Sequence, residues 1–351
     1  MDGFLPDQPI LLPRGLTSQA NLLHVFDSHE LAGLYSQRQK LLADNSPMAE
    51  IAKGSSWSNP IAVGDAKMRV FFSPEPGGRK SETATRKSLD AVVNAVKKAK
   101  ESVIFCMYSP TDSELLNAML AAGDKGKILL GLLNSIADPT KKKKKDSNNQ
   151  SDSGEPPAKP SAATQVQITL YKRSRKDKKV LSYDYFRPGA APAGFLPELN
   201  SVDLTSKSIV PPSPDAKKSA PPAVHIHHKF VLIDAETSHP IIYTGSNNMS
   251  HNSTYNNDEN LLEITECPRL AQIYLSEFIR LYEHYRARAV WDMNHPKGKT
   301  KKTAGSNADL IKNHKLQDAF TLKTTRDEWV KAAYKKGSQD YLMRTRLANP
   351  S

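Results

Sequence analysis

Residues 225–264 hold the densest set of side chains that could do chemistry in this sequence. The candidates share polar or ionisable groups and are His227, Lys229, Asp234, Ser246, Asn248 and Glu259. The first three follow the spacing His-x-Lys-x4-Asp, and the next two belong to a Gly-Ser-x-Asn segment. This order of residue types is the starting point for a hypothesis about function.

The first pair has a geometry suited to phosphate chemistry. Residues two apart on a strand point to the same face, so His227 and Lys229 are expected to project together. An imidazole can act as nucleophile or proton carrier near neutral pH, and an ammonium can hold a phosphate oxygen. The hydroxyl of Ser246 and the amide of Asn248 offer further hydrogen bonds to the same anion. Such parts are those of phosphoryl transfer without a metal.

The two carboxylates are expected to differ in role. Glu259 is a candidate to orient the imidazole of His227 through its other ring nitrogen, which is the usual work of a third group. Asp234 falls on the opposite face from His227 by strand alternation, which favours a supporting role. A metal cluster drawn from His225, His227 and His239 lacks a carboxylate at ligand spacing, so no metal or other cofactor is expected.

An isolated His-x-Lys pair is most often only a solvated strand face. The complete string, with its trailing Gly-Ser-x-Asn and acidic residue, argues against that interpretation here.

An alternation of strands and helices must position these side chains. The predicted strands are 68–73, 103–108, 128–133, 166–171, 224–234, 241–244 and 261–264. The predicted helices are 89–99, 115–122 and one with an apolar stripe of Leu270, Ile273, Tyr274, Phe278 and Leu281. A β-α-β-α-β pattern followed by consecutive strands predicts an α/β (α+β) fold, a mixed sheet flanked by helices on both faces.

Composition divides the chain into three parts. We expect an N-terminal segment at 1–60, a catalytic domain at 61–294 and a basic C-terminal tail at 295–351. Within the domain, 138–160 contains five consecutive lysines and 208–222 is rich in proline, so both are expected to be flexible loops.

One internal repeat links the first and second parts. Residues 19–35 align with 258–274, with identities that include Asn21 on Asn260. The match is either a coincidence between two amphipathic units or the remnant, at 15–44, of a lost first copy of the domain.

Charge and cysteine content narrow the classes of function. The chain has 351 residues and a formal charge of +12, which favours polyanionic partners. Residues 291–351 alone contain thirteen Lys and Arg against six Asp and Glu. Two cysteines exclude a disulfide scaffold. The sequence shows no membrane-length apolar run and no secretory signal, so a cytoplasmic location is expected.

The motif string resembles the signature of the phospholipase D superfamily, and the resemblance extends to bacterial phospholipase D-like proteins and nucleases. It implies the fold of that superfamily and a catalytic set of His227, Lys229, Asp234 and Glu259. It also implies that one motif histidine attacks phosphorus to form a phosphohistidine, while a second protonates the leaving oxygen. By this resemblance Lys229, Ser246 and Asn248 bind the phosphate of a phosphodiester substrate.

The chain departs from that pattern because it contains a single complete motif. Two copies could pair to build one site, a separate protein could supply the second motif, or the chain could be an inactive nucleic-acid- or membrane-binding relative. We favour a homodimer, since a site on a two-fold axis needs no other partner. The basic charge favours nucleic acid as substrate, with phospholipid as the alternative.

Overall fold

The structure is a computed structural model that describes four main stretches of the chain. These are residues 19–77, 85–108, 110–133 and 225–294, with isolated positions at 165, 330, 334–336, 341, 345 and 347. The expected loops at 138–160 and 208–222, the expected strand at 166–171 and nearly all of the basic tail lie outside the described residues.

A mixed sheet of seven strands forms the centre of the domain, in the order β2-β3-β9-β8-β7-β4-β5. Its strands are β2 (Ile61–Val63), β3 (Ala66–Phe72), β4 (Ser102–Met107), β5 (Ile128–Leu133), β7 (Lys229–Ile233), β8 (Ile241–Gly245) and β9 (Asn260–Thr265). Only β4 and β5 pair in parallel, and every other neighbouring pair is antiparallel.

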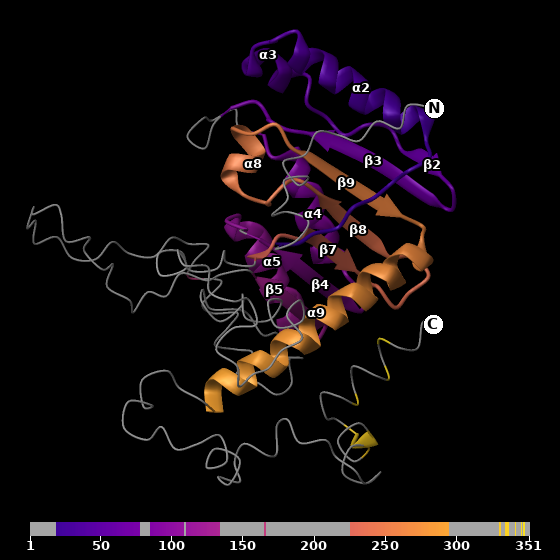
Figure 1. Ribbon diagram of the computed structural model, residues 1–351, viewed down its shortest axis with the longest axis vertical. Coiled ribbons are helices and arrows are strands. Elements are labelled where there is room, and N and C mark those ends of the chain that lie inside the picture. The colour runs from indigo at the N-terminus through magenta and orange to yellow at the C-terminus, as the bar shows by residue number, and fades with distance from the viewer. Residues whose placement is uncertain are drawn as a thin grey trace, which may run out of the picture.

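Helices cover both faces of this sheet. On one face the hydroxyl oxygen of Tyr243 in β8 lies 3.2 Å from the carbonyl of Ala91 in α4 (Lys87–Lys98). On the other face the ring of Phe230 packs against Tyr274 of α9 (Pro268–Asn294), with centroids 5.1 Å apart. Figure 1 shows α9 crossing the sheet, with α4 and α5 (Ser113–Asp124) on the far side. The predicted fold class is therefore confirmed.

Strand β4 and the edge strand β5 are buried along their whole length, as their continuous apolar sequences require. The ring of Phe105 in β4 lies over Gly131 of β5, where any Cβ atom would overlap it. Glycine at this position therefore lets the largest side chain of β4 pack flat against its neighbour.

The N-terminal residues pack against the domain. Strand β1 (Gln19–Ala20) pairs in parallel with β6 (His225–Ile226), and residues 21–28, here called the strap, lead into α2 (His29–Ala43). Ser28 caps α2 by accepting a hydrogen bond from the Leu31 N–H at 3.2 Å. Of the expected 15–44 unit, the helix is present, but the strap does not join the seven-stranded sheet.

A second anchor holds α2 in place. The guanidinium of Arg38, almost fully buried, donates from Nε to Asp258 Oδ1 at 2.7 Å and from Nη2 to the Ser73 carbonyl. This contact joins α2 to the loop that precedes β9.

Two details of the sequence prediction are wrong. The single strand expected at 224–234 is broken into β6 and β7, with His227 and His228 between them. Ile273, expected on the apolar stripe of α9, is 57% exposed because the buried stripe runs through Ala271, Tyr274 and Leu275 instead.

Four short elements were not predicted: β1, α3 (Met48–Lys53), β2 and α8 (His251–Tyr255). Among the described residues, no helix has both the length and the apolar character needed to cross a bilayer.

Candidate active site

The ends of strands β4, β7, β8 and β9 lie next to one another at one end of the sheet. Met107, the last residue of β4, pairs with Lys229, the first residue of β7. Gly245, the last residue of β8, pairs with Leu261 near the start of β9. The segments that carry His227 and Glu259 enter the sheet at this same edge, so the topology brings most of the predicted site residues to one end of the domain.

His227 and Lys229 lie in direct contact. Lys229 Nζ is 3.1 Å from His227 Nδ1 and donates a hydrogen bond to the His227 carbonyl at 2.7 Å. The ring of Tyr108 packs against the imidazole with centroids 4.8 Å apart, and the Lys229 ammonium lies 5.4 Å from the same ring. A tyrosine face next to an ammonium stabilises the charge modestly.

The ammonium of Lys229 is poorly hydrated. Burial lowers the pKa of Lys229 to about 8, and the negative charge of Glu259 acts in the opposite direction. Lys229 therefore remains mostly charged at pH 7, but it lacks the water that an exposed lysine would have. A cation in this state gains more from binding an anion than a hydrated one does.

Glu259 does not take the position expected for it. Its Oε1 accepts a hydrogen bond from Asn257 Nδ2 at 3.0 Å, and its charge acts on Lys229. The Nδ1 atom of His227 instead lies 3.0 Å from Oδ1 of Asn21 in the strap. Asn21 was not among the predicted site residues, and its alignment with Asn260 in the internal repeat did not by itself indicate a contact with His227.

Ser246 is held against the start of β9. Its backbone N–H donates to the Asn260 carbonyl at 3.1 Å, and its Oγ accepts from the Asn260 N–H at 3.0 Å. Gly245 just before it has φ +137° and approaches Asn260 too closely for any Cβ atom. Since the hydroxyl oxygen acts as acceptor, its hydrogen stays available to donate to an anion.

The amide of Asn248 has an unmet hydrogen bond. Its backbone N–H donates to Ser253 Oγ at 3.1 Å, but its side-chain Oδ1 is buried without a hydrogen-bond partner among the described residues. The neighbouring Asn247 is almost completely buried, and its Nδ2 donates to the Ser253 carbonyl at 3.3 Å, which fixes the loop. This oxygen can accept a hydrogen bond from a ligand, whereas the oxygens of a phosphate would have to be bound through the Nδ2 hydrogens of Asn248.

Asp234 lies at the opposite end of β7 from His227. The five residues of β7 span roughly 17 Å, so the structure does not bring this carboxylate to the His-Lys pair. It accepts backbone hydrogen bonds from Lys100, Glu101 and Ser102, at 2.8–3.1 Å. Its geometry is that of a structural cap joining the end of β7 to the start of β4.

Two other histidines of the motif region, His228 and His239, lie away from the His227–Lys229 pair. His228 is buried against Phe230 on the α9 face, and burial lowers its pKa; its Nε2 is 3.7 Å from Glu277, too long for a hydrogen bond. His239 is exposed in the turn between β7 and β8. In the part of the chain that the structure describes, no three His, Cys, Asp or Glu side chains are grouped to hold a metal.

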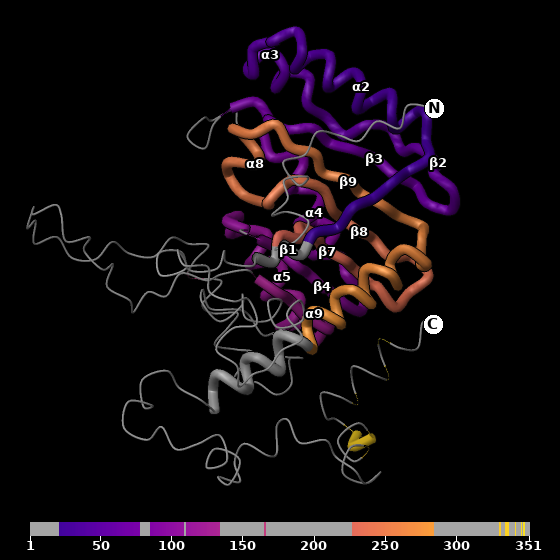
Figure 2. Tube along the Cα trace, viewed as in Figure 1, coloured from indigo at the N-terminus to yellow at the C-terminus, as the bar shows by residue number. Residues whose placement is uncertain are grey.

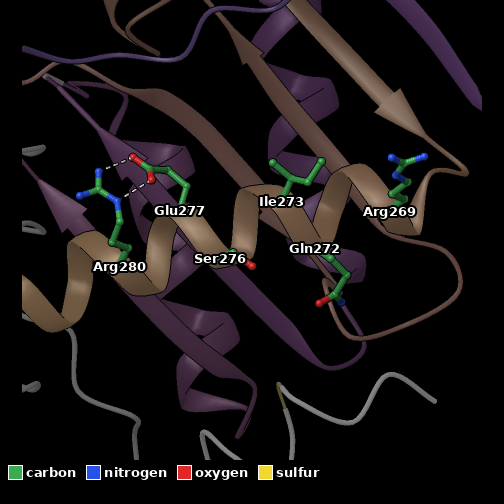
Figure 3. A pocket seen from close by; sticks show the side chains of 6 residues that line it. All are labelled: Arg269, Gln272, Ile273, Ser276, Glu277 and Arg280. Carbon is green, nitrogen blue, oxygen red and sulfur yellow. Dashed lines mark hydrogen bonds and ion pairs between the residues drawn. The ribbon is translucent and has the colours of Figure 1, made fainter.

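A groove on the outer face of α9 is separate from this site. Figure 3 shows its lining, which comes from one helix: Arg269, Gln272, Ile273, Ser276, Glu277 and Arg280. Glu277 and Arg280 pair with each other across it. None of the predicted site residues lines this groove.

The family comparison covers the segment that carries the site. Residues 209–282 match a family model described as the phospholipase D-like domain of cardiolipin synthase. This range includes His227, Lys229, Ser246, Asn248 and Glu259. The resemblance to the phospholipase D superfamily is thus confirmed, and this segment is a phospholipase D-like sequence.

One curated protein is similar to this chain over a shorter segment. The mitochondrial cardiolipin hydrolase of Danio rerio is 39% identical over 61 residues, which is 17% of this chain and 25% of the relative. The chain therefore matches about a quarter of that protein's length.

Two solved structures are distantly alike. The phospholipase D family member Nuc from Salmonella typhimurium has 15% identity and a TM-score of 0.34, covering 62% of this chain and 95% of its own. NucT from Helicobacter pylori has 17% identity and a TM-score of 0.36, covering 62% and 97%.

Proposed function

We propose that this protein is a phosphodiesterase that cleaves through a phosphohistidine on His227. The observation that carries the proposal is the contact between His227 and Lys229 at the sheet edge, with the ammonium buried and its pKa lowered to about 8. A nucleophile and a poorly hydrated cation side by side suit a negatively charged phosphorus centre.

The reaction has two displacements. The Nε2 lone pair of His227 attacks phosphorus, the bond to the leaving oxygen breaks, and that oxygen takes up a proton. Water then attacks the phosphohistidine and gives a proton to the histidine that protonated the leaving oxygen, while the P–N bond breaks and His227 is regenerated. Lys229 holds a non-bridging oxygen throughout, while Ser246 and Asn248 add hydrogen bonds that strengthen as charge develops.

The proton for the leaving oxygen comes from the His227 of a second copy of the chain. The sequence has no other His-x-Lys-x4-Asp string, and a site on a two-fold axis brings two copies of one motif together. Subunit mixing tests this arrangement. If both histidines are required, activity in randomly assembled mixtures of wild type and His227→Ala falls as the square of the wild-type fraction. A linear fall, or full activity in a monomer of measured mass, would reject the shared site.

Nucleic acid is the favoured substrate. The support is the formal charge of +12 and the excess of lysine and arginine in residues 291–351. The second candidate is a phospholipid, because the matching family model and the zebrafish relative are both named for cardiolipin.

Product analysis separates the candidates. Purified protein is incubated with DNA, RNA, and vesicles of cardiolipin or phosphatidylcholine, each with excess EDTA. We expect nucleic-acid products with wild type and with His239→Ala, an exposed histidine at the other end of the sheet, but none with His227→Ala. Lipid products alone would favour the second candidate, and the absence of any product would favour an inactive binding protein. Activity lost to EDTA and restored by Mg²⁺ or Zn²⁺ would contradict the metal-independent mechanism.

A further inference from the structure

The strap places an amide against the proposed nucleophile. Because Gln19 pairs with His225 and Ala20 with Ile226, the parallel β1–β6 register leads directly to Asn21 beside His227. The side chains meet there, with Asn21 Oδ1 at 3.0 Å from His227 Nδ1. The two residues are 206 positions apart in the sequence.

Other side chains of the strap hold it in position. His24 stacks between Phe26 and Tyr274, with centroid distances of 5.6 and 5.5 Å, and its Nε2 is 2.6 Å from the Tyr274 hydroxyl. Leu23 and Val25 alternate with these anchors and are 69% and 83% exposed. Figure 2 shows the strap running between β1 and α2 across the strands. The strap is therefore anchored by contacts that do not involve Asn21.

We infer that Asn21 is a positioning residue that fixes the tautomer of His227, an inference that rests on the proposed function. A neutral imidazole has one N–H, and Nε2 can attack phosphorus only when the proton is on Nδ1. Asn21 Oδ1 accepts that Nδ1–H. Without such an acceptor, the Lys229 ammonium, 3.1 Å from the same nitrogen, would donate to it and favour the unreactive tautomer.

Asn21 and Lys229 can thus both form a hydrogen bond with Nδ1 of His227, and substrate binding determines which of them does. When a phosphate oxygen binds the Lys229 ammonium, the lysine no longer donates to Nδ1, and Asn21 keeps the proton there. A neutral amide also fixes the proton without stabilising the imidazolium, which a carboxylate would do. Glu259 is not needed for this task, since its Oε1 bonds to Asn257.

The tautomer can be measured without substrate. In protein labelled with ¹⁵N-histidine, the His227 signals among the ten histidines are identified by their loss in His227→Gln. We expect a predominant Nδ1–H form in wild type with inorganic phosphate bound and, in phosphate-free protein, a larger fraction of the Nε2–H form in Asn21→Leu than in wild type. Leu23→Ala, which removes an exposed side chain of the same strap, should leave the spectrum unchanged. The same tautomer in wild type and Asn21→Leu would overturn the inference.

Kinetics give a second readout that a merely structural role would not move. Loss of one neutral hydrogen bond predicts a fall in kcat of about tenfold in Asn21→Leu, with KM little changed. Asn21→Asp keeps an acceptor and should retain the Nδ1–H tautomer and most of kcat. Its added charge favours the imidazolium of both the nucleophilic and the acidic His227, so both limbs of the pH–rate profile should move to higher pH.

The role of Asn21 and the proposed function can be tested separately. An unchanged pH profile in Asn21→Asp, or equal kcat in wild type and Asn21→Leu, would also overturn the role of Asn21. A wild-type protein that cleaves nothing would reject the proposed function, and the NMR comparison would still decide whether Asn21 sets the tautomer.

Discussion

Replacing Asp234 should lower the free energy of unfolding but leave the activity largely unchanged, although the residue is part of the motif that predicted the site. Its carboxylate accepts hydrogen bonds from the N–H groups of Lys100, Glu101 and Ser102, and its backbone is left-handed, with φ +53°. These two features make separate contributions, and three substitutions can distinguish them.

The magnitude follows from which groups lose their partners. Ser102 is completely buried, so its N–H would be stranded in Asp234→Ala at a cost of about 1–3 kcal/mol. Lys100 is exposed and Glu101 half-buried, so water replaces their lost bonds at little cost. Alanine lacks the polar side chain that helps aspartate tolerate the left-handed region, which adds about 1 kcal/mol. We expect Asp234→Ala to lower the free energy of unfolding by about 3 kcal/mol.

Asp234→Gly and Asp234→Asn are the matched controls. Glycine loses the same hydrogen bonds without the backbone strain, so it should be about 1 kcal/mol more stable than alanine. Asparagine tolerates the left-handed region and keeps one acceptor oxygen, so it should lose about 1 kcal/mol relative to wild type. Urea unfolding measured by far-UV circular dichroism gives these differences.

Activity at low temperature, where each variant is folded, should stay within a few-fold of wild type. An Asp234→Asn protein that is as stable as wild type but inactive would contradict this prediction and indicate that Asp234 takes part in the reaction.

Further outcomes follow from other contacts. Inhibition by inorganic phosphate should weaken as pH rises through about 8, where Lys229 loses its charge, and Lys229→Arg should extend inhibition to higher pH. The same burial penalises the folded state below pH 8 and is relieved between about 8 and 10.5, so Lys229→Met should raise the free energy of unfolding at pH 7 by about 1–3 kcal/mol. Gly131→Ala should lower it by about 3 kcal/mol, since its Cβ overlaps the Phe105 ring; an equal urea midpoint would contradict that packing. Neutralising the lysines of 297–302 should flatten the salt dependence of binding to duplex DNA by up to about three units, and an unchanged slope would remove the charge-based support for nucleic acid.

The sequence predicted the buried strands well because their signal is local. The apolar run at 128–133 coincides with β5, and the run at 103–108 differs from β4 by one residue at each end. Both strands are buried on both faces, so every residue in them is selected for the same property.

Contacts between distant segments could not be predicted in the same way. Strand β1 has two residues and no periodicity of its own, and it exists only because β6 offers it a partner more than 200 residues away. The placement of Asn21 beside His227 depends on that pairing, as does the release of Glu259 from the role predicted for it. The motif spacing identified the His-Lys pair, but the partner of its ring nitrogen was decided by tertiary structure.

Strands β5 and β7, which precede and follow residues 134–224 in the chain, are both neighbours of β4. Strand β5 ends at Leu133, and Leu133 and Lys229 both pair with Met107, so the chain leaves and re-enters the sheet about 10 Å apart. A linker of only a few residues is long enough to close such a gap. The sheet therefore sets no demand on the number of residues between these two strands, because a short or a long connection would join the same two ends. Leu133 and Lys229 lie at the same end of the sheet as His227, so a change in the length or sequence of that connection would alter the chain next to the candidate site while the seven strands keep their places.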